Sequence, residues 1–192
     1  MSQLKRALPL HLAGVASLLI FASAQGADKS SPAFEGKDTL LRPQGYREWV
    51  FVGSSLGLRY PKGVEKPSSS QAKSFNNVYI DPAAFRAFSR TGQFPEGTVM
   101  VLEILSSDAK AEPGLQGEYE REFIALEAAV KDRRRFDGGW GYFSFDDGEG
   151  KLKEKATPFA RASCFECHDK KAALDHVFTQ FYPVLRAAQP RK

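Results

Sequence analysis

One short motif in the chain combines residue types and spacing that could do chemistry: Cys164-Phe165-Glu166-Cys167-His168. Two thiols three residues apart lie on one helical turn, where they can form thioether bonds to the two vinyl groups of one porphyrin. The histidine that follows can place its imidazole under the iron as an axial ligand. The motif therefore predicts one covalently attached c-type haem, held by Cys164 and Cys167, with the iron bound by His168.

Three other uses of these cysteines have less support. A zinc site needs two further ligands, and after residue 24 the only other histidine is His176. A thioredoxin-like dithiol follows a strand in a βαβ unit, and the pattern before Cys164 is not of that kind. A disulfide between Cys164 and Cys167 stays open as an alternative in an oxidising compartment.

The residue on the other side of the iron decides what such a haem could do. Apart from Met1, the only methionine is Met100; as an iron ligand it would make an electron carrier, and otherwise it is ordinary packing. His176 is expected on the same helix as His168 and thus on the same side of the haem. No strong ligand is left over, which favours an open or water-bound position for a small gas molecule.

Residues 1–24 are typical of an export signal. Lys5 and Arg6 precede an apolar stretch from Leu8 to Phe21, and Ala22-Ser23-Ala24 offers small residues at a cleavage site. An uncleaved membrane anchor is the alternative. Cleavage would place the mature protein in the periplasm of a bacterial cell.

The mature chain would be nearly neutral. Without residues 1–24 it has 25 Lys and Arg against 23 Asp and Glu, a formal charge of +2. The one basic cluster, Lys131 to Arg135, lacks the interleaved aromatic residues of a nucleic-acid interface, so no nucleic-acid partner is expected. We expect a solvated turn there, or a docking patch for a redox partner.

The pattern of apolar residues indicates a single α+β domain at residues 45–192, preceded by an irregular leader at 25–44. A helix begins after Asp81, which is suited to cap it, and ends near Arg90. Another amphipathic helix, carrying the haem motif, should run from Cys167 to about Pro183. The remaining expected elements are strands at 46–52, 76–80, 98–105 and 140–145 and a loop at 62–70.

Residues 118–131 are ambiguous on local pattern. Their composition and the spacing of Phe123, Leu126 and Val130 favour a helix. Gly117 before the segment and Asp137-Gly138-Gly139 after it are instead the punctuation of hairpins.

Several stretches in a fixed order resemble the cytochrome P460 family, which includes the cytochromes c-prime-beta. Besides the haem motif, they are residues 46–53, 77–82, 91–99, 129–132, 136–143 and 175–183. The resemblance implies a mainly antiparallel sheet packed on helices, usually as a homodimer, and it implies that residues 118–131 form a strand. On a strand, Ala125, Glu127 and Ala129 would share one face and leave room for a macrocycle.

The resemblance also suggests roles for single residues. Members that oxidise hydroxylamine have a lysine cross-linked to the haem ring, and the aligned position here is Leu102. Residues 98–105 contain no lysine, which favours the c-prime-beta-like branch, whose apolar distal site binds nitric oxide. Phe143 would lie near the distal face or in ordinary core, and Asn77 at a polar distal position. Glu127 would match a distal proton acceptor, or else be a surface or salt-bridged glutamate.

The sequence is therefore compatible with three functions. The first is a haem protein that binds nitric oxide or a similar small ligand, with or without electron transfer. The second is an oxidoreductase acting on hydroxylamine or nitric oxide with Glu127 as proton acceptor. The third is an electron carrier with Met100 as an iron ligand.

Overall fold

The computed structural model describes residues 32–58 and 73–190. The expected export signal and the loop expected at 62–70 lie outside the described residues. Among the described helices, none has the length and apolar character needed to cross a membrane. In chain order the elements are β1 (Phe34–Glu35), β2 (Thr39–Leu41), the 3-10 helix η1 (Tyr46–Glu48), β3 (Val50–Leu56), β4 (Ser74–Ile80), α1 (Pro82–Thr91), β5 (Val99–Glu112), β6 (Leu115–Lys131), β7 (Trp140–Ser144), β8 (Lys155–Ala156), α2 (Phe165–Lys171), η2 (Thr179–Phe181) and α3 (Pro183–Ala188).

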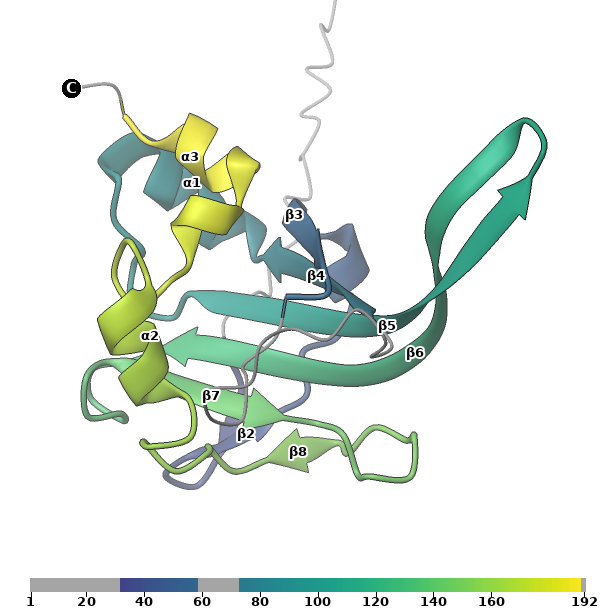
Figure 1. Cartoon of the computed structure of the whole chain (residues 1–192). Helices are drawn as coiled ribbons and strands as arrows, with labels where there is room; N and C mark the ends of the chain where they lie inside the picture. Colours follow the sequence, from purple (N-terminus) through teal and green to yellow (C-terminus); the bar gives the residue numbers. More distant parts are fainter. Residues whose placement is uncertain (1–31, 59–72, 191–192) are drawn as a thin grey trace, which may run out of the picture.

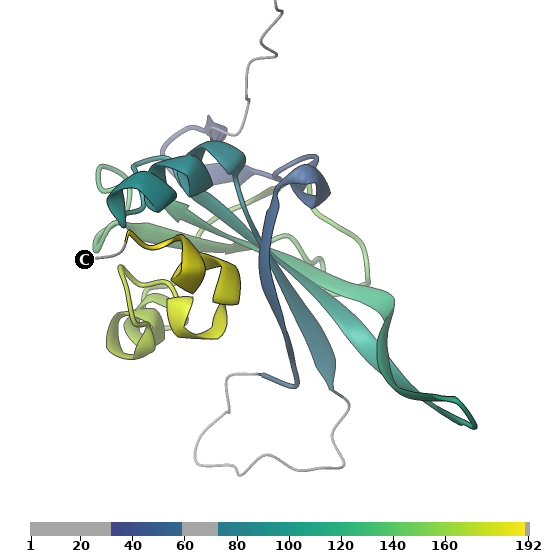
Figure 2. The same ribbon diagram turned by 90° about the horizontal axis from the view of Figure 1, so that it is seen from above.

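The strands form two antiparallel sheets, so the expected α+β class with a mainly antiparallel sheet is confirmed. The larger sheet has the order β3-β4-β5-β6-β7 and the smaller one the order β1-β2-β8. Figure 1 shows the three α-helices gathered near one end of the larger sheet, away from the tip of the β5–β6 hairpin. Seen from above in Figure 2, that hairpin projects far beyond the body of the domain.

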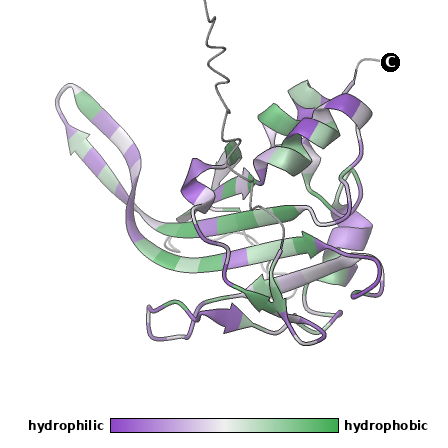
Figure 3. Cartoon of the chain, turned by 180° about the vertical axis from the view of Figure 1, so that it is seen from behind, coloured by the Kyte–Doolittle hydropathy of each residue, from purple (hydrophilic) through white to green (hydrophobic). Residues whose placement is uncertain are grey.

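Alternation along the strands sends apolar side chains into two cores, one on each face of the larger sheet. Met100 and Leu102 of β5 pack with α1, α2 and α3, whereas Val99 and Val101 pack with Leu40 of the smaller sheet. A strand has a period of two, so neighbouring residues point to opposite faces. Figure 3 shows hydrophobic colour concentrated where β5 and β6 cross the body and more hydrophilic colour toward the projecting tip.

The helix predicted after Asp81 is confirmed as α1. The Asp81 side chain accepts a hydrogen bond from Ala84 N at 2.7 Å, and its other oxygen accepts one from Val99 N at 3.1 Å. The first bond satisfies an N-terminal amide of the helix, as an N-cap does, and the second ties the helix to β5. Gly92 ends the helix in the left-handed conformation, with φ 72°.

The ambiguous segment is a strand, as the family resemblance implied. Residues 118–131 lie within β6, which pairs with β5 on one side and β7 on the other. Two partner strands supply hydrogen bonds and packing that outweigh the helical preference of the local sequence. Consequently the strand brings Glu127 beside Leu102 of β5.

Two expectations near the start of the domain are wrong in part. The described portion of the leader, residues 32–44, contains β1 and β2, and Leu40 is only 1% exposed. The described part of the leader therefore belongs to the second core, which is the core between the larger sheet and the smaller sheet. The first long strand also begins later than expected, because Tyr46–Glu48 forms η1 and β3 starts at Val50.

The long helix expected from Cys167 to Pro183 is wrong. Helix α2 ends at Lys171, and Asp175 and His176 adopt positive φ values of 46° and 60°. Two successive left-handed residues cannot continue a right-handed helix, so the chain reverses there. His176 therefore does not lie on the helix of His168. In the basic cluster, Arg133 and Arg134 are exposed in a turn as expected, whereas Lys131 is buried, at 3% exposure, at the end of β6.

Candidate functional site

A cavity of about 650 Å³, counted to its open mouth, lies between the larger sheet and the segment around α2. The residues singled out from the sequence that line it include Met100, Leu102, Glu127, Phe143, Cys164, His168 and His176. The cavity thus lies between two residues of the haem motif, Cys164 and His168, and the sheet face that carries Leu102 and Glu127.

The haem motif lies on one helical turn. Cys164 is the N-cap of α2, and its carbonyl accepts hydrogen bonds from Cys167 N at 3.1 Å and His168 N at 3.2 Å. This places the two cysteines one turn apart, the arrangement that attachment to one porphyrin edge requires. Cys167 is half-buried and, unlike Cys164, does not line the cavity.

The side chain of Phe165, inside the motif, docks α2 onto the body. It is 4% exposed, and its ring lies directly over Gly138, where an added Cβ would be 2.1 Å from Phe165 Cζ. Arg161 covers the same ring, with its guanidinium carbon 3.8 Å from the ring centroid. The close packing of Phe165 against Gly138 and Arg161 therefore fixes the position of the haem motif relative to the sheet.

His168 is held in the state that an iron ligand needs. Its Nδ1 donates a hydrogen bond to the carbonyl oxygen of His176 at 2.7 Å. Burial lowers the pKa of His168, although the His176 carbonyl acts in the opposite direction. The imidazole is therefore neutral, and Nε2 carries the lone pair that would bind iron. The rings of Tyr142 and Phe178 pack against it, with centroids 4.4 and 4.6 Å away.

The environment of the cysteines weakens the alternatives to haem. Burial raises the pKa of the Cys164 thiol to about 11, with Glu127 and Cys167 adding to the shift. Redox-active dithiols depend on a lowered thiol pKa. The structure forms no disulfide between Cys164 and Cys167. Among residues 32–58 and 73–190, no three His, Cys, Asp or Glu side chains converge as a zinc site requires. The donor set fits haem best.

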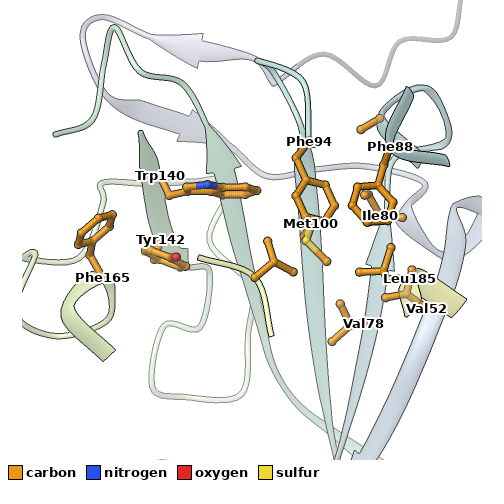
Figure 4. Close-up of a cluster of buried hydrophobic side chains, with 12 residues drawn as sticks. Val52, Val78, Ile80, Phe88, Phe94, Met100, Trp140, Tyr142, Phe165 and Leu185 are labelled. Atoms are coloured by element: carbon orange, nitrogen blue, oxygen red, sulfur yellow. The ribbon is translucent and has the colours of Figure 1, made fainter. Parts of the chain in front are cut away.

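The sheet wall of the cavity is apolar around Leu102. In the sheet, Leu102 lies between Val78 of β4 and Glu127 of β6, and Met100 lies between Ile80 and Ala129. Figure 4 shows Met100 with Trp140 and Tyr142 among the side chains on this face. Leu102 therefore lines the cavity wall, and Met100 is both a wall residue and part of the buried core.

Glu127 is the acidic group in this wall. Burial raises its pKa, and the nearby carboxylate of Asp146 raises it further. A carboxyl group with a raised pKa can exchange a proton closer to neutral pH than an ordinary glutamate. The position is therefore compatible with the proton-acceptor role that the family resemblance suggested, and it is not that of an exposed surface glutamate.

Two sequence-based site residues lie elsewhere. The Phe143 ring borders Phe34 and Phe136 in the second core, with centroids 6.2 and 5.8 Å away. Phe143 touches the cavity region, but alternation along β7 turns its side chain to the opposite face. Asn77 pairs with Glu103, on the face opposite Leu102, and donates to Glu120 at 2.8 Å. Neither side chain therefore lies on the sheet face that carries Leu102.

Sequence reasoning missed the aromatic residues that do line the cavity: Trp140, Tyr142, Phe178 and Tyr182. Alternation along β7 could have found the first two, because they occupy the face that excludes Phe143. The other two follow the unexpected chain reversal after α2, for which the sequence gives no clear local signal.

A comparison with protein families gives one match. The family model described as Cytochrome P460 matches residues 43–179. The matched segment is more than half of the chain and includes the whole haem motif, the cavity strands and the chain reversal at Asp175 and His176. No curated protein matches the chain.

Proposed function

Because the chain belongs to the cytochrome P460 family and is therefore a haem protein, we propose that it captures nitric oxide at the open position of a c-type haem. In this proposal Cys164 and Cys167 attach the haem and His168 binds its iron. The observation that carries the proposal is that His168 and the apolar wall around Leu102 line the same cavity.

The chemistry of the wall supports a small neutral ligand. When bound, the haem iron supplies the coordination position and the change of oxidation state. The residues of the cavity wall determine which ligands can reach that position. A neutral diatomic molecule loses little hydration on entering a site lined by Val78 and Leu102, whereas a charged ligand pays a large desolvation cost. When ionised, the half-buried Glu127 beside Leu102 disfavours anions further.

The first test is the optical spectrum of the matured protein, ferric and ferrous, before and after addition of nitric oxide. A high-spin spectrum that shifts with nitric oxide is the expected result. Leu102→Asp should weaken nitric oxide binding, because it places an ionisable group in the apolar wall. Phe143→Leu, on the other face of the sheet, is the matched control and should leave binding unchanged. A wild-type spectrum that ignores nitric oxide would refute the proposal.

The same spectra distinguish an electron carrier. Met100 lines the cavity, so ligation by its sulfur would give a low-spin wild-type spectrum that Met100→Leu converts to high spin. We expect the wild-type spectrum to be high-spin already and Met100→Leu to leave it so, because Met100 packs within the core.

The assignment to the c-prime-beta-like branch is tested at Leu102. Leu102 faces the cavity, so Leu102→Lys would place an amine where the hydroxylamine-oxidising branch has its cross-link. We expect a change in the mass and spectrum of the attached haem. An unaltered haem in a folded variant would contradict the alignment.

Oxidation of hydroxylamine is the second candidate, favoured by the raised pKa of Glu127 in the cavity wall. In that reaction Glu127 would accept the proton released by the substrate. Turnover of hydroxylamine by the wild type, abolished by Glu127→Gln with the haem content unchanged, would support this function. No turnover by the wild type would rule out this second candidate.

The setting of the protein is also a proposal. We propose that residues 1–24 direct export to the periplasm, that the mature chain forms a homodimer and that a redox partner exchanges electrons with its haem. The mass of the mature chain should correspond to an N-terminus at Gln25. Light scattering should give twice the protomer mass, and a monomer at all concentrations would refute the dimer.

A further inference from the structure

The ion pair between Lys131 and Asp175 lies outside the cavity, yet it connects to the axial histidine. Lys131 is the last residue of β6, and its side chain is 4% exposed. Its Nζ donates to Asp175 Oδ2 at 2.6 Å and to the carbonyl oxygen of Phe94 at 2.6 Å. Trp140 Nε1 donates to the other carboxylate oxygen of Asp175 at 3.3 Å. Two groups from the body of the fold, the Lys131 ammonium and the Trp140 indole N–H, therefore meet at Asp175.

Asp175 begins the chain reversal that carries the histidine's hydrogen-bond partner. Asp175 and His176 have φ values of 46° and 60°. Residues other than glycine adopt such values rarely, and the surrounding structure must hold them there. The contacts from Lys131 and Trp140 anchor the first residue of this reversal to the sheet.

The reversal aims one carbonyl at the proximal imidazole. The carbonyl oxygen of His176 accepts from His168 Nδ1 at 2.7 Å, and it also accepts from the hydroxyl of Tyr142 at 3.3 Å. A hydrogen bond of this kind orients a histidine ligand and increases its basicity. Displacement of the His176 carbonyl would lengthen its hydrogen bond with His168 Nδ1 and lower the basicity of the His168 imidazole.

We propose that the Lys131–Asp175 pair positions the His176 carbonyl and thereby tunes the axial ligand His168, an inference that rests on the proposed ligation of iron by His168. Lys131 and Asp175 are positioning residues, because they act on the iron only through the reversal and the imidazole. A buried lysine needs a partner, and the choice of Asp175 as that partner places the ion pair at the first residue of the reversal.

The test uses the haem-loaded protein with Lys131→Met or Asp175→Asn. Lys131→Met keeps the length of the side chain and removes the donor, and Asp175→Asn keeps the shape and an oxygen for Trp140. The two readouts are the iron–histidine stretching frequency of the ferrous protein and the reduction potential. We expect a lower frequency and a higher potential, because a less basic imidazole favours ferrous iron. The ferric–ferrous equilibrium should shift by up to about tenfold, which corresponds to ~59 mV for one electron.

Glu103→Gln is the matched control. Glu103 is also buried, at 3% exposure, and accepts hydrogen bonds from Tyr46 and Arg47. It lies on the face of the sheet opposite Leu102, so the variant should lose stability with both readouts unchanged. If Lys131→Met does not fold, Asp175→Asn decides the question by itself.

The possible outcomes separate this inference from the proposed function. Frequency and potential shifts in the Lys131 or Asp175 variant, absent in the Glu103 variant, would support the positioning role. A loss of stability with both readouts at their wild-type values would overturn that role and leave the haem ligation intact. A wild-type ferrous protein that is five-coordinate and high-spin but has no iron–histidine band would overturn the ligation itself and this inference with it.

Discussion

Gly138 offers a sharp test of how the haem helix is docked. Its φ is +86°, and a Cβ at this position would lie 2.1 Å from Phe165 Cζ and 2.4 Å from Cε2. Gly138→Ala therefore imposes a left-handed alanine, at a cost of roughly 1–2 kcal/mol. It also expels a Phe165 ring that is 4% exposed, and losing the burial of such a ring costs about 1.5–3 kcal/mol. We expect a total loss of about 2.5–5 kcal/mol in the free energy of unfolding.

Gly148→Ala separates the two contributions. Gly148 has φ +82° and no heavy atom within 4 Å of the added Cβ, so the variant should lose only the roughly 1–2 kcal/mol of backbone strain. Denaturant unfolding of both variants measures the difference, and the yield of covalently attached haem measures the effect on the motif. Gly138→Ala should also mature poorly, because Phe165 lies between the two cysteines. Equal stability losses in the two variants would refute the proposed docking by Phe165.

Three further predictions concern the sheet and its two faces. Glu127→Gln should stabilise the fold at neutral pH. Burial raises the pKa of Glu127 in the folded protein, so the protonated glutamate contributes its full stability below the ordinary value of 4.5, and this contribution is lost as the pH rises through the folded pKa. Glutamine stays neutral and does not lose it. Unfolding at neutral pH and below 4.5 measures this gain, which should vanish in acid, and an equal gain at both pH values would contradict the burial argument. Phe143→Ala should cost about 3–5 kcal/mol and leave the haem spectrum unchanged, and an altered spectrum in a folded variant would return Phe143 to the distal site. Leu40→Ala should cost about 2–5 kcal/mol in denaturant unfolding, and a loss near zero would mean that the leader is not part of the core.

Residues that act through near neighbours in the chain could be predicted from the sequence. Cys164, Cys167 and His168 are one turn of helix apart in any helical context, so their spacing alone indicated haem attachment. Asp81 caps α1 through Ala84, three residues later, and this bond depends on local geometry only. The Asp81 cap and the helical turn of the motif are confirmed, because the interactions that create them lie within a few residues.

The family resemblance went further than local pattern, though not to every side chain. It predicted correctly that residues 118–131 form a strand, and it singled out Leu102, which lines the cavity. It also suggested Phe143 and Asn77 as distal residues, and both lie on the opposite face of the sheet. The direction of a strand side chain depends on register, and a shift of one residue reverses it.

The chain reversal at Asp175 and His176 was decided by the tertiary structure alone. The sequence there has the apolar spacing of a helix, and local pattern therefore predicted that α2 continues. Instead Lys131 and Trp140, more than thirty residues earlier, bind the Asp175 carboxylate and hold two residues in a left-handed conformation. Local sequence determines which residues can bind a haem. The position of the carbonyl that orients His168 depends on contacts between distant segments, which exist only once the sheet has formed.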